Sequence, residues 1–246
     1  MGGTPANADF QLASFTDDSS SKSGTKLPSK VGAAAAQAWE ALAPIVPRNA
    51  AACPAGTKNL GSLLCVHDAE TRIPLRDYGG YTNANAWILV HTISDLIEAI
   101  RSRVGTCDVI SGLHIEAHGG WSGSGGFRMG NDTNGNGHIE GGEAQDFVST
   151  QAHAAKFGAI IKNALAPNAF ISVAACASAG NNNDFIKALQ AATGAIVIGT
   201  PSGCRSGGNW FTGAWWECSK GRVQINKDGT TKVDPSDDGT GIWKPF

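Results

Sequence analysis

The sequence predicts an α/β fold with a mostly parallel sheet, arranged in three layers with helices on both faces of the sheet. From residue 85 onward, short apolar segments alternate with segments whose apolar residues follow helical spacing, and this alternation is typical of βαβ units. The 246 residues include 32 glycines but only 16% charged residues, which favours a compact core with long glycine-rich loops over a helical bundle.

Three regions of the chain differ in composition. Residues 1–30 are rich in Ser, Gly, Asp and Lys and almost free of large aliphatic residues, so we interpret them as a disordered tail or a propeptide. Residues 31–84 are expected to form an N-terminal extension, with one helix in its first part and an irregular stretch at 50–84. Residues 85–246 are expected to form the α/β domain.

The individual elements follow from apolar spacing and from end signals. Thr92 and Asp95 resemble a capping box, Pro167 is expected to stop the next helix, and the run NNND at 181–184 caps a helix that ends at Gly194. The expected helices cover 33–46, 93–104, 154–165 and 185–193. The expected strands cover 62–66, 71–75, 86–90, 113–117, 169–175, 195–199 and 222–226.

Charge, hydropathy and cysteine spacing exclude several function classes. The net charge of −2, without a run of basic residues, provides no electrostatic footprint for nucleic acid. No apolar stretch approaches the ~20 residues that span a bilayer, so no membrane span is expected. None of the six cysteines occurs in a CxxC spacing, which excludes zinc ribbons and thioredoxin-like sites.

The cysteine spacing also bears on compartment. Cys53 with Cys65, and Cys204 with Cys218, are spaced like local disulfide loops in segments rich in glycine and tryptophan. Disulfides persist in oxidising compartments, so the cysteine spacing favours an extracellular or periplasmic location.

Two chemically active side chains stand where predicted parallel strands end. His118 follows LHIEA, and Cys176 follows AFISVAA. Adjacent parallel strands lie about 4.8 Å apart, and sites in α/β sheets collect at the carboxyl ends of the strands. An imidazole beside a thiol can hold it as a thiolate and later protonate a leaving amine. The N–H groups of Gly119 and Cys176 could stabilise an oxyanion, and the missing side chain at Gly119 would let a substrate carbonyl approach.

These two segments resemble the caspase-like (clan CD) cysteine peptidases, in which an apolar block precedes His-Gly and a second apolar block ends in Ala-Cys. The similarity lies in ISGLHIEAHGG and NAFISVAACASAG, and the separation of His118 and Cys176 is close to the roughly 50 residues of caspases. It covers about residues 85–200, and AACAS replaces the caspase QACxG string, so no subfamily is assigned. The resemblance implies a caspase-like fold, an endopeptidase with base His118 and nucleophile Cys176, and a peptide or protein substrate.

Other interpretations compete with an active peptidase. A serine esterase with nucleophile Ser178 is rejected, because that fold places its histidine after the serine and no histidine follows Ser178 here. The remaining alternative is an inactive caspase-like domain that serves as a calcium-binding interaction module. In that case Cys176 would be a small buried residue or would pair with Cys107. A reactive thiolate at Cys176 would favour the enzyme, and a disulfide there would favour the module.

Residues 132–143, DTNGNGHIEGGE, match the twelve-residue calcium loop of EF-hands. Oxygen ligands at alternate positions wrap the ion, a glycine allows the sharp turn, and the last carboxylate binds bidentately. The preceding FRMGN is not helical in pattern and two asparagines replace aspartates, so a modest affinity is expected, with a solvated turn as the alternative. The expected calcium ligands are Asp132, Asn134, Asn136, His138 through its carbonyl, Glu140 through a water, and Glu143.

Further candidates lie around the expected site. The tryptophan-rich loop 200–221 follows the strand after the Cys176 strand, where the resembled family builds its primary specificity pocket. The substrate-binding candidates are Trp210, Trp215, Trp216 and Asp184, with packing and helix capping as the alternative roles. His114 and Glu116 share a strand face with His118, and structural roles are expected for both. Residues 1–30 are interpreted as a propeptide that the enzyme removes by autoprocessing.

Overall fold

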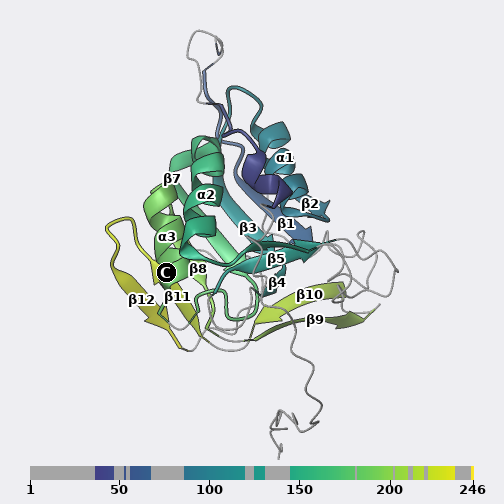
Figure 1. The fold of residues 1–246 in the computed structure, drawn as a ribbon, viewed down its shortest axis with the longest axis vertical. Helices are drawn as coiled ribbons and strands as arrows, with labels where there is room; N and C mark the ends of the chain where they lie inside the picture. The colour runs from purple at the N-terminus through teal and green to yellow at the C-terminus, as the bar shows by residue number, and fades with distance from the viewer. Residues whose placement is uncertain are drawn as a thin grey trace, which may run out of the picture. The chain divides into compact units, whose positions relative to one another are not determined.

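A central sheet of seven strands organises the computed structural model (Figure 1). The strands are β1 (Ser62–His67), β2 (Ala86–Val90), β3 (Ile110–Glu116), β7 (Leu165–Ala174), β8 (Ile196–Gly199), β11 (Arg222–Ile225) and β12 (Thr231–Asp234). Their order across the sheet is β12-β11-β8-β7-β3-β1-β2. The five strands from β8 to β2 are parallel, and β11 runs antiparallel to both of its neighbours. The predicted α/β class with a mostly parallel sheet is therefore confirmed.

The structure describes residues 37–46, 53, 56–67, 86–119, 125–130, 145–180, 182–201, 203–209, 213–218, 221–235 and 245–246. These residues belong to one compact unit, Ala36–Phe246. The expected propeptide at 1–30 and the expected strand at 71–75 lie outside them.

The parallel strands follow the order of a doubly wound sheet. From β1 the chain moves outward to β2, returns past β1 to β3, and then steps to β7 and β8. In sheets of this order, functional groups collect at the carboxyl ends of the strands, beside the point where the strand order reverses. That point lies between β1 and β3, so the residues that follow β1, β3 and β7 are the candidates for a site.

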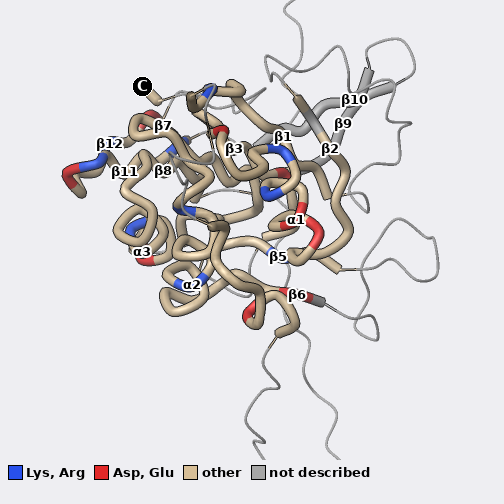
Figure 2. The backbone as a smooth tube through the Cα atoms, turned by 90° about the horizontal axis from the view of Figure 1, so that it is seen from above, with Lys and Arg blue, Asp and Glu red and all other residues tan. Residues whose placement is uncertain are grey.

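Helices α1 (Ile93–Val104), α2 (Gln151–Ile161) and α3 (Asp184–Thr193) cover one face of the sheet, as the view from above shows (Figure 2). Helix α1 lies in the connection from β2 to β3, α2 in that from β3 to β7, and α3 in that from β7 to β8. All three connections cross the sheet in the same direction, and right-handed connections of this kind place their helices on the same face. Their buried side chains share one core with Leu113 and Ile171 of the sheet. Among the described α-helices none covers the opposite face, so the predicted third layer remains a prediction. No described helix is long and apolar enough to cross a membrane.

The ends of the helices agree only in part with the sequence signals. The capping box at α1 is confirmed, because Thr92 and Asp95 each donate a backbone N–H to the other's side chain. The prediction that Pro167 stops α2 is wrong. Helix α2 ends at Ile161 and is followed by a 3-10 turn, η5 (Lys162–Ala164), whereas Pro167 lies near the start of β7. The pairing of β7 with β3 shifts register between Leu165 and Phe170, and a proline, which lacks an N–H, is tolerated at such an irregularity.

The start of α3 also differs from the prediction. Its N-cap residue, Asn183, has a left-handed backbone with φ of 60°, and its side chain makes no capping hydrogen bond. The predicted end at Gly194 is confirmed, since Gly194 adopts φ of 70° at the C-cap, a backbone conformation that glycine allows without strain.

The segment before the sheet is built into the core instead of forming the expected helix. In the described part of 33–46, only η1 (Ala38–Ala41) is helical, as a 3-10 turn, and the chain then extends to residue 46. Tertiary contacts explain the difference: Trp39 is fully buried against Phe157, and Ile45 N–H donates to the carbonyl of Ile160 at 2.8 Å. These contacts outweigh the helix propensity of the alanines.

The N-terminal extension also supplies a strand to the middle of the sheet. Strand β1, expected at 62–66, pairs with β2 on one side and β3 on the other. Part of the expected extension is thus continuous with the α/β sheet.

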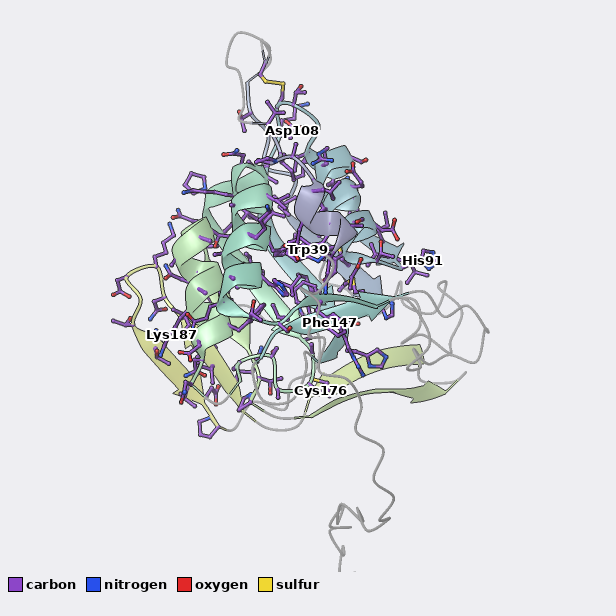
Figure 3. All side chains as sticks on the ribbon, viewed as in Figure 1. Trp39, His91, Asp108, Phe147, Cys176 and Lys187 are labelled. Carbon is purple, nitrogen blue, oxygen red and sulfur yellow. A yellow bond between two sulfur atoms is a disulfide. The ribbon has the colours of Figure 1, made fainter. Side chains whose placement is uncertain are left out.

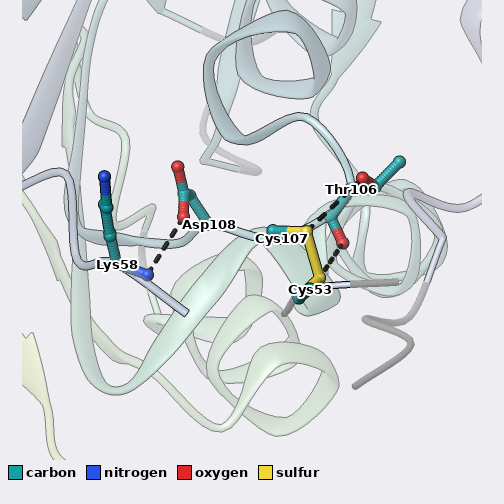
Figure 4. Close-up of a disulfide and its surroundings, with 5 residues drawn as sticks. All are labelled: Cys53, Lys58, Thr106, Cys107 and Asp108. Carbon is teal, nitrogen blue, oxygen red and sulfur yellow. Dashed lines mark hydrogen bonds between the residues drawn. A yellow bond between two sulfur atoms is a disulfide. The ribbon is translucent and has the colours of Figure 1, made fainter. Parts of the chain in front are cut away.

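The disulfide pairing corrects the sequence prediction. Cys53 bonds to Cys107, not to Cys65, and so connects the segment before β1 to the turn after α1 (Figure 4). The neighbouring Lys58 N–H donates to the Asp108 carboxylate at 3.0 Å. Cys65 is a free thiol, fully buried in β1, and burial raises its pKa well above the ordinary range.

Candidate active site

His118 stands at the start of a small second sheet that continues from the end of β3. This three-stranded sheet consists of β4 (His118–Gly119), β5 (Phe127–Gly130) and β6 (Gln145–Val148). His118 lies opposite Arg128 in the antiparallel pair of β4 and β5. Phe127 anchors the sheet, because its ring packs edge-on against Phe157 of α2 and Phe185 of α3. The half-buried His118 is therefore held on a short strand at the carboxyl edge of the main sheet.

Cys176 lies in the turn that follows β7, at the same edge of the sheet (Figure 3). The next residue, Ala177, has φ of 50°, an uncommon backbone conformation for a residue with a side chain. Ser178 secures the turn, since its hydroxyl donates to the Val173 carbonyl at 2.6 Å and accepts from Thr200 N–H at 3.0 Å. Ser178 is fully buried and fully engaged, which agrees with the rejection of a serine nucleophile.

The structure brings the His-Gly segment against Cys176. The register pairs Glu116 with Ala174, and Ala117 N–H donates to the Ala174 carbonyl at 3.4 Å. A Cβ placed on Gly119 would lie 2.2 Å from the carbonyl oxygen of Cys176 and 2.8 Å from its Cβ. The glycine is required by the protein's own backbone, which is a different reason from the substrate access predicted from the sequence.

The Cys176 thiol is free, partly exposed and in contact with the backbone of Cys204. Cys204 N–H donates to Cys176 Sγ at 3.0 Å, and Sγ lies 3.2 Å from the Cys204 carbonyl oxygen. The sulfur therefore accepts one hydrogen bond from the Cys204 backbone and is placed to donate one back to it. The possible Cys176–Cys107 disulfide is excluded, because Cys107 bonds to Cys53.

Cys204 is held in place by a two-stranded hairpin, β9 (Cys204–Asn209) and β10 (Gly213–Cys218). Cys204 is disulfide-bonded, and the register places Cys218 directly opposite it, in agreement with the predicted local loop. Its contact with Cys176 could not be predicted from the sequence, because it involves only backbone atoms of Cys204.

A second backbone contact ties the connection after His118 to the turn that carries Cys176. Gly126 N–H donates to the Ser178 carbonyl at 2.9 Å. Gly126 has φ of 87°, and a Cβ there would lie 2.0 Å from the Val148 carbonyl oxygen, so only glycine fits. The small sheet is thus fixed both to β3 through His118 and to β7 through this turn.

His67 is a site residue that the sequence analysis missed. It ends β1, is fully buried, and its ring centroid lies 6.0 Å from that of His118, with an interplanar angle of 61°. The signal that found His118, a polar residue at the end of an apolar strand, applies equally to His67. The sequence analysis placed this strand in the N-terminal extension and ended it at residue 66.

The other histidine candidate has the structural role that was expected. His114 is fully buried on the face of the sheet away from the α-helices, and its Nδ1 hydrogen-bonds to the Ser172 hydroxyl on β7. Its Nε2 lies 3.3 Å from a carboxylate oxygen of Glu116. The two residues expected to be structural therefore form one buried polar cluster with Ser172.

The remaining predicted site residues are not joined to this edge by the described contacts. Asp184 is exposed at the first position of α3, where a carboxylate complements the helix dipole. Trp215 and Trp216 lie in β10, and Trp210 lies outside the described residues. The predicted calcium ligands Asp132, Asn134, Asn136, His138, Glu140 and Glu143 also lie outside them. Within the described residues, no group of three or more His, Cys, Asp or Glu could hold a metal ion.

Comparisons with known proteins give no match: no protein-family model, no curated protein and no solved structure is similar to the chain. A function for this chain is therefore inferred from the chemistry of His67, His118 and Cys176 at the carboxyl edge of the sheet.

Proposed function

We propose that this chain is a cysteine endopeptidase with a caspase-like fold, in which Cys176 is the nucleophile and His118 the base. One observation carries the proposal: a free, partly exposed thiol follows β7, directly against the His-Gly segment that follows the adjacent strand β3. A disulfide at Cys176 would have favoured the alternative of an inactive module, and Cys176 forms none. A reactive thiolate is what would favour the enzyme, and the labelling experiment below measures that reactivity.

The proposed chemistry is acyl transfer through a thioester. The Cys176 thiolate attacks the carbonyl carbon of the scissile peptide bond, and the His118 imidazolium protonates the departing amine as the C–N bond breaks. Water then attacks the thioester while His118 accepts its proton, and the thiolate leaves. The N–H groups of Gly119 and Cys176 are the proposed donors to the oxyanion. The N–H of Cys204, which donates to Sγ, holds the sulfur in place before attack.

The first prediction concerns the reactivity of Cys176. Iodoacetamide near neutral pH should alkylate Cys176 faster than it alkylates glutathione, because the proposed base His118 accepts the thiol proton. Cys65 is a matched internal control, since it is also a free thiol but is buried and protonated. Peptide mapping by mass spectrometry should find the label on Cys176 and none on Cys65. His118→Ala should slow the labelling by about 10-fold or more.

The same variants test peptide hydrolysis. Cys176→Ala should lower turnover of a mixed peptide library by at least about 10³-fold while leaving the circular dichroism spectrum unchanged. Undiminished hydrolysis by purified Cys176→Ala would overturn the assignment. Alkylation of Cys176 at the glutathione rate, unaffected by His118→Ala, would show that the two residues are not a catalytic pair.

A further inference from the structure

His67 is placed where the carboxyl ends of three strands converge. It ends β1, and its Nε2 lies 2.8 Å from the carbonyl oxygen of Gly130, at the end of β5. The same nitrogen lies 3.1 Å from the carbonyl oxygen of His91, the residue after β2. Its ring meets His118, at the start of β4, in an edge-on contact. One buried side chain therefore joins the ends of β1, β2 and the small sheet.

The backbone contacts of His67 fix the orientation of its ring. Its Nε2 lies close to the carbonyl oxygens of His91 and Gly130, and Gly130 N–H also points at it, at 3.2 Å. A ring whose Nε2 contacts two different segments cannot rotate without losing both sets of contacts. Because the side chain is fully buried, water cannot replace those contacts.

The backbone of His118 lies on a strand of two residues, and its side chain is only half-buried. The ring of His67 limits the rotation of the His118 ring, while Gly130, bonded to His67, belongs to the strand that pairs with His118. The ring of His118 therefore contacts His67 directly, and its backbone is connected to His67 through β5.

We infer that His67 is a positioning residue for His118, holding the His118 imidazole in the orientation that its proposed reaction with Cys176 requires. The inference rests on the proposed role of His118 as base. His67 acts through its ring contact, and its hydrogen bonds to Gly130 and His91 keep that ring in place. Misplacement of a catalytic group by about 1 Å can cost roughly 100-fold in rate, so loss of the contact should be measurable.

The experiment compares three variants of the full chain. His67→Leu removes the ring and the hydrogen bonds, His67→Phe retains a ring of similar size, and His153→Leu is the matched control. His153 also makes an edge-on ring contact, to Trp39 at 5.8 Å, but unlike His67 it is partly exposed, and it lies on α2. The two measurements are the ¹⁵N-imidazole NMR signals of His118, assigned from His118→Ala, and the rate of Cys176 alkylation by iodoacetamide at pH 7.

His67→Leu should shift the His118 ring signals and slow alkylation by roughly 10-fold. His67→Phe keeps a ring but loses the hydrogen bonds that hold it, so its rate should lie between those of His67→Leu and the wild type. His153→Leu should change neither measurement. The inference is wrong if His67→Leu leaves both measurements at their wild-type values. It is also wrong if His67→Phe, folded by near-UV circular dichroism, is as slow as His118→Ala. If His118→Ala itself alkylates normally, the proposed function fails, and the NMR signals still decide whether His67 orients His118.

Discussion

At the residue scale, the approach of β4 to Cys176 leaves no room for a side chain at position 119. A Cβ on Gly119 would lie 2.2 Å from the carbonyl oxygen of Cys176, a separation that real Cβ atoms do not show. The obstacle is backbone, which cannot swing aside as a flexible side chain would. The position of His118 relative to the thiol therefore depends directly on the absence of a side chain on the residue that follows it.

Gly119→Ala should consequently separate the two strand ends. Forced overpacking of this kind typically costs about 1–3 kcal/mol, so the melting temperature should fall by several degrees and Cys176 alkylation should slow. Gly203→Ala is the matched control, because a Cβ there has nothing within 4 Å. Differential scanning calorimetry and iodoacetamide labelling of both variants test this. Equal melting temperatures and labelling rates for the two variants would contradict the close approach.

Residue-level reasoning from the sequence succeeded where a signal is local. His118 and Cys176 follow long apolar segments, and both lie at the carboxyl edge as predicted. The contact of Cys204 with Cys176 joins residues from different elements through backbone N–H and C=O groups, which every residue carries. No pattern of side chains could have indicated it.

At the element scale, the long strands and amphipathic helices were predictable and the short elements were not. Strands β4, β5 and β6 have only two to four residues each, too few to establish an alternating pattern. They exist because Phe127 and Val148 are buried beneath the helices. Such elements are stabilised by tertiary contacts, which the sequence alone does not reveal.

One of these short strands carries a carboxylate that favours protonation. Asp146 on β6 is half-buried, and desolvation raises its pKa, although Ile93 N–H at the start of α1 lowers it and the charge of Asp95 raises it further. A raised pKa means that the folded state binds the proton more tightly. This group therefore favours folding below its unfolded-state pKa, and that contribution is lost as the pH rises through the folded-state value.

Asp146→Asn should raise the melting temperature at pH 7 by about 1–3 °C, since solvent screens part of the effect at a half-buried site. The gain should disappear below the ordinary aspartate pKa of about 3.9. Asp228→Asn should behave oppositely, because hydrogen bonds from the Thr230 hydroxyl and N–H lower the pKa of Asp228. Its stabilising contribution is present above the unfolded pKa and is lost as the pH falls. Melting curves across pH 3–7 for both variants test the two signs, and a common sign would contradict the assignment.

At the scale of the whole molecule, the calcium-like loop begins next to a residue that contacts the candidate site. The segment 131–144 connects Gly130 to Gln145, and these two residues face each other in the β5–β6 pair. Gly130 also hydrogen-bonds to His67, whose ring contacts His118. A change in the position of Gly130 would therefore be transmitted to the His118 ring through the side chain of His67. The ligand assignment itself rests on the sequence match alone.

Calcium should bind this loop and speed the reaction of Cys176. The expected dissociation constant is about 10⁻⁴–10⁻³ M, as in extracellular modules, and Asp132→Ala/Glu143→Ala should abolish binding by removing two of the three loop carboxylates. Calorimetry on the wild type, on this double variant and on the exposed control Asp228→Ala measures binding. Iodoacetamide labelling of Cys176, with calcium and with chelator, measures the coupling. If calcium binds neither wild type nor control, the loop is only a turn. If calcium binds but labelling is unchanged, the ion does not act on the site, because a ligand shifts a conformational equilibrium only by its differential affinity for the two states.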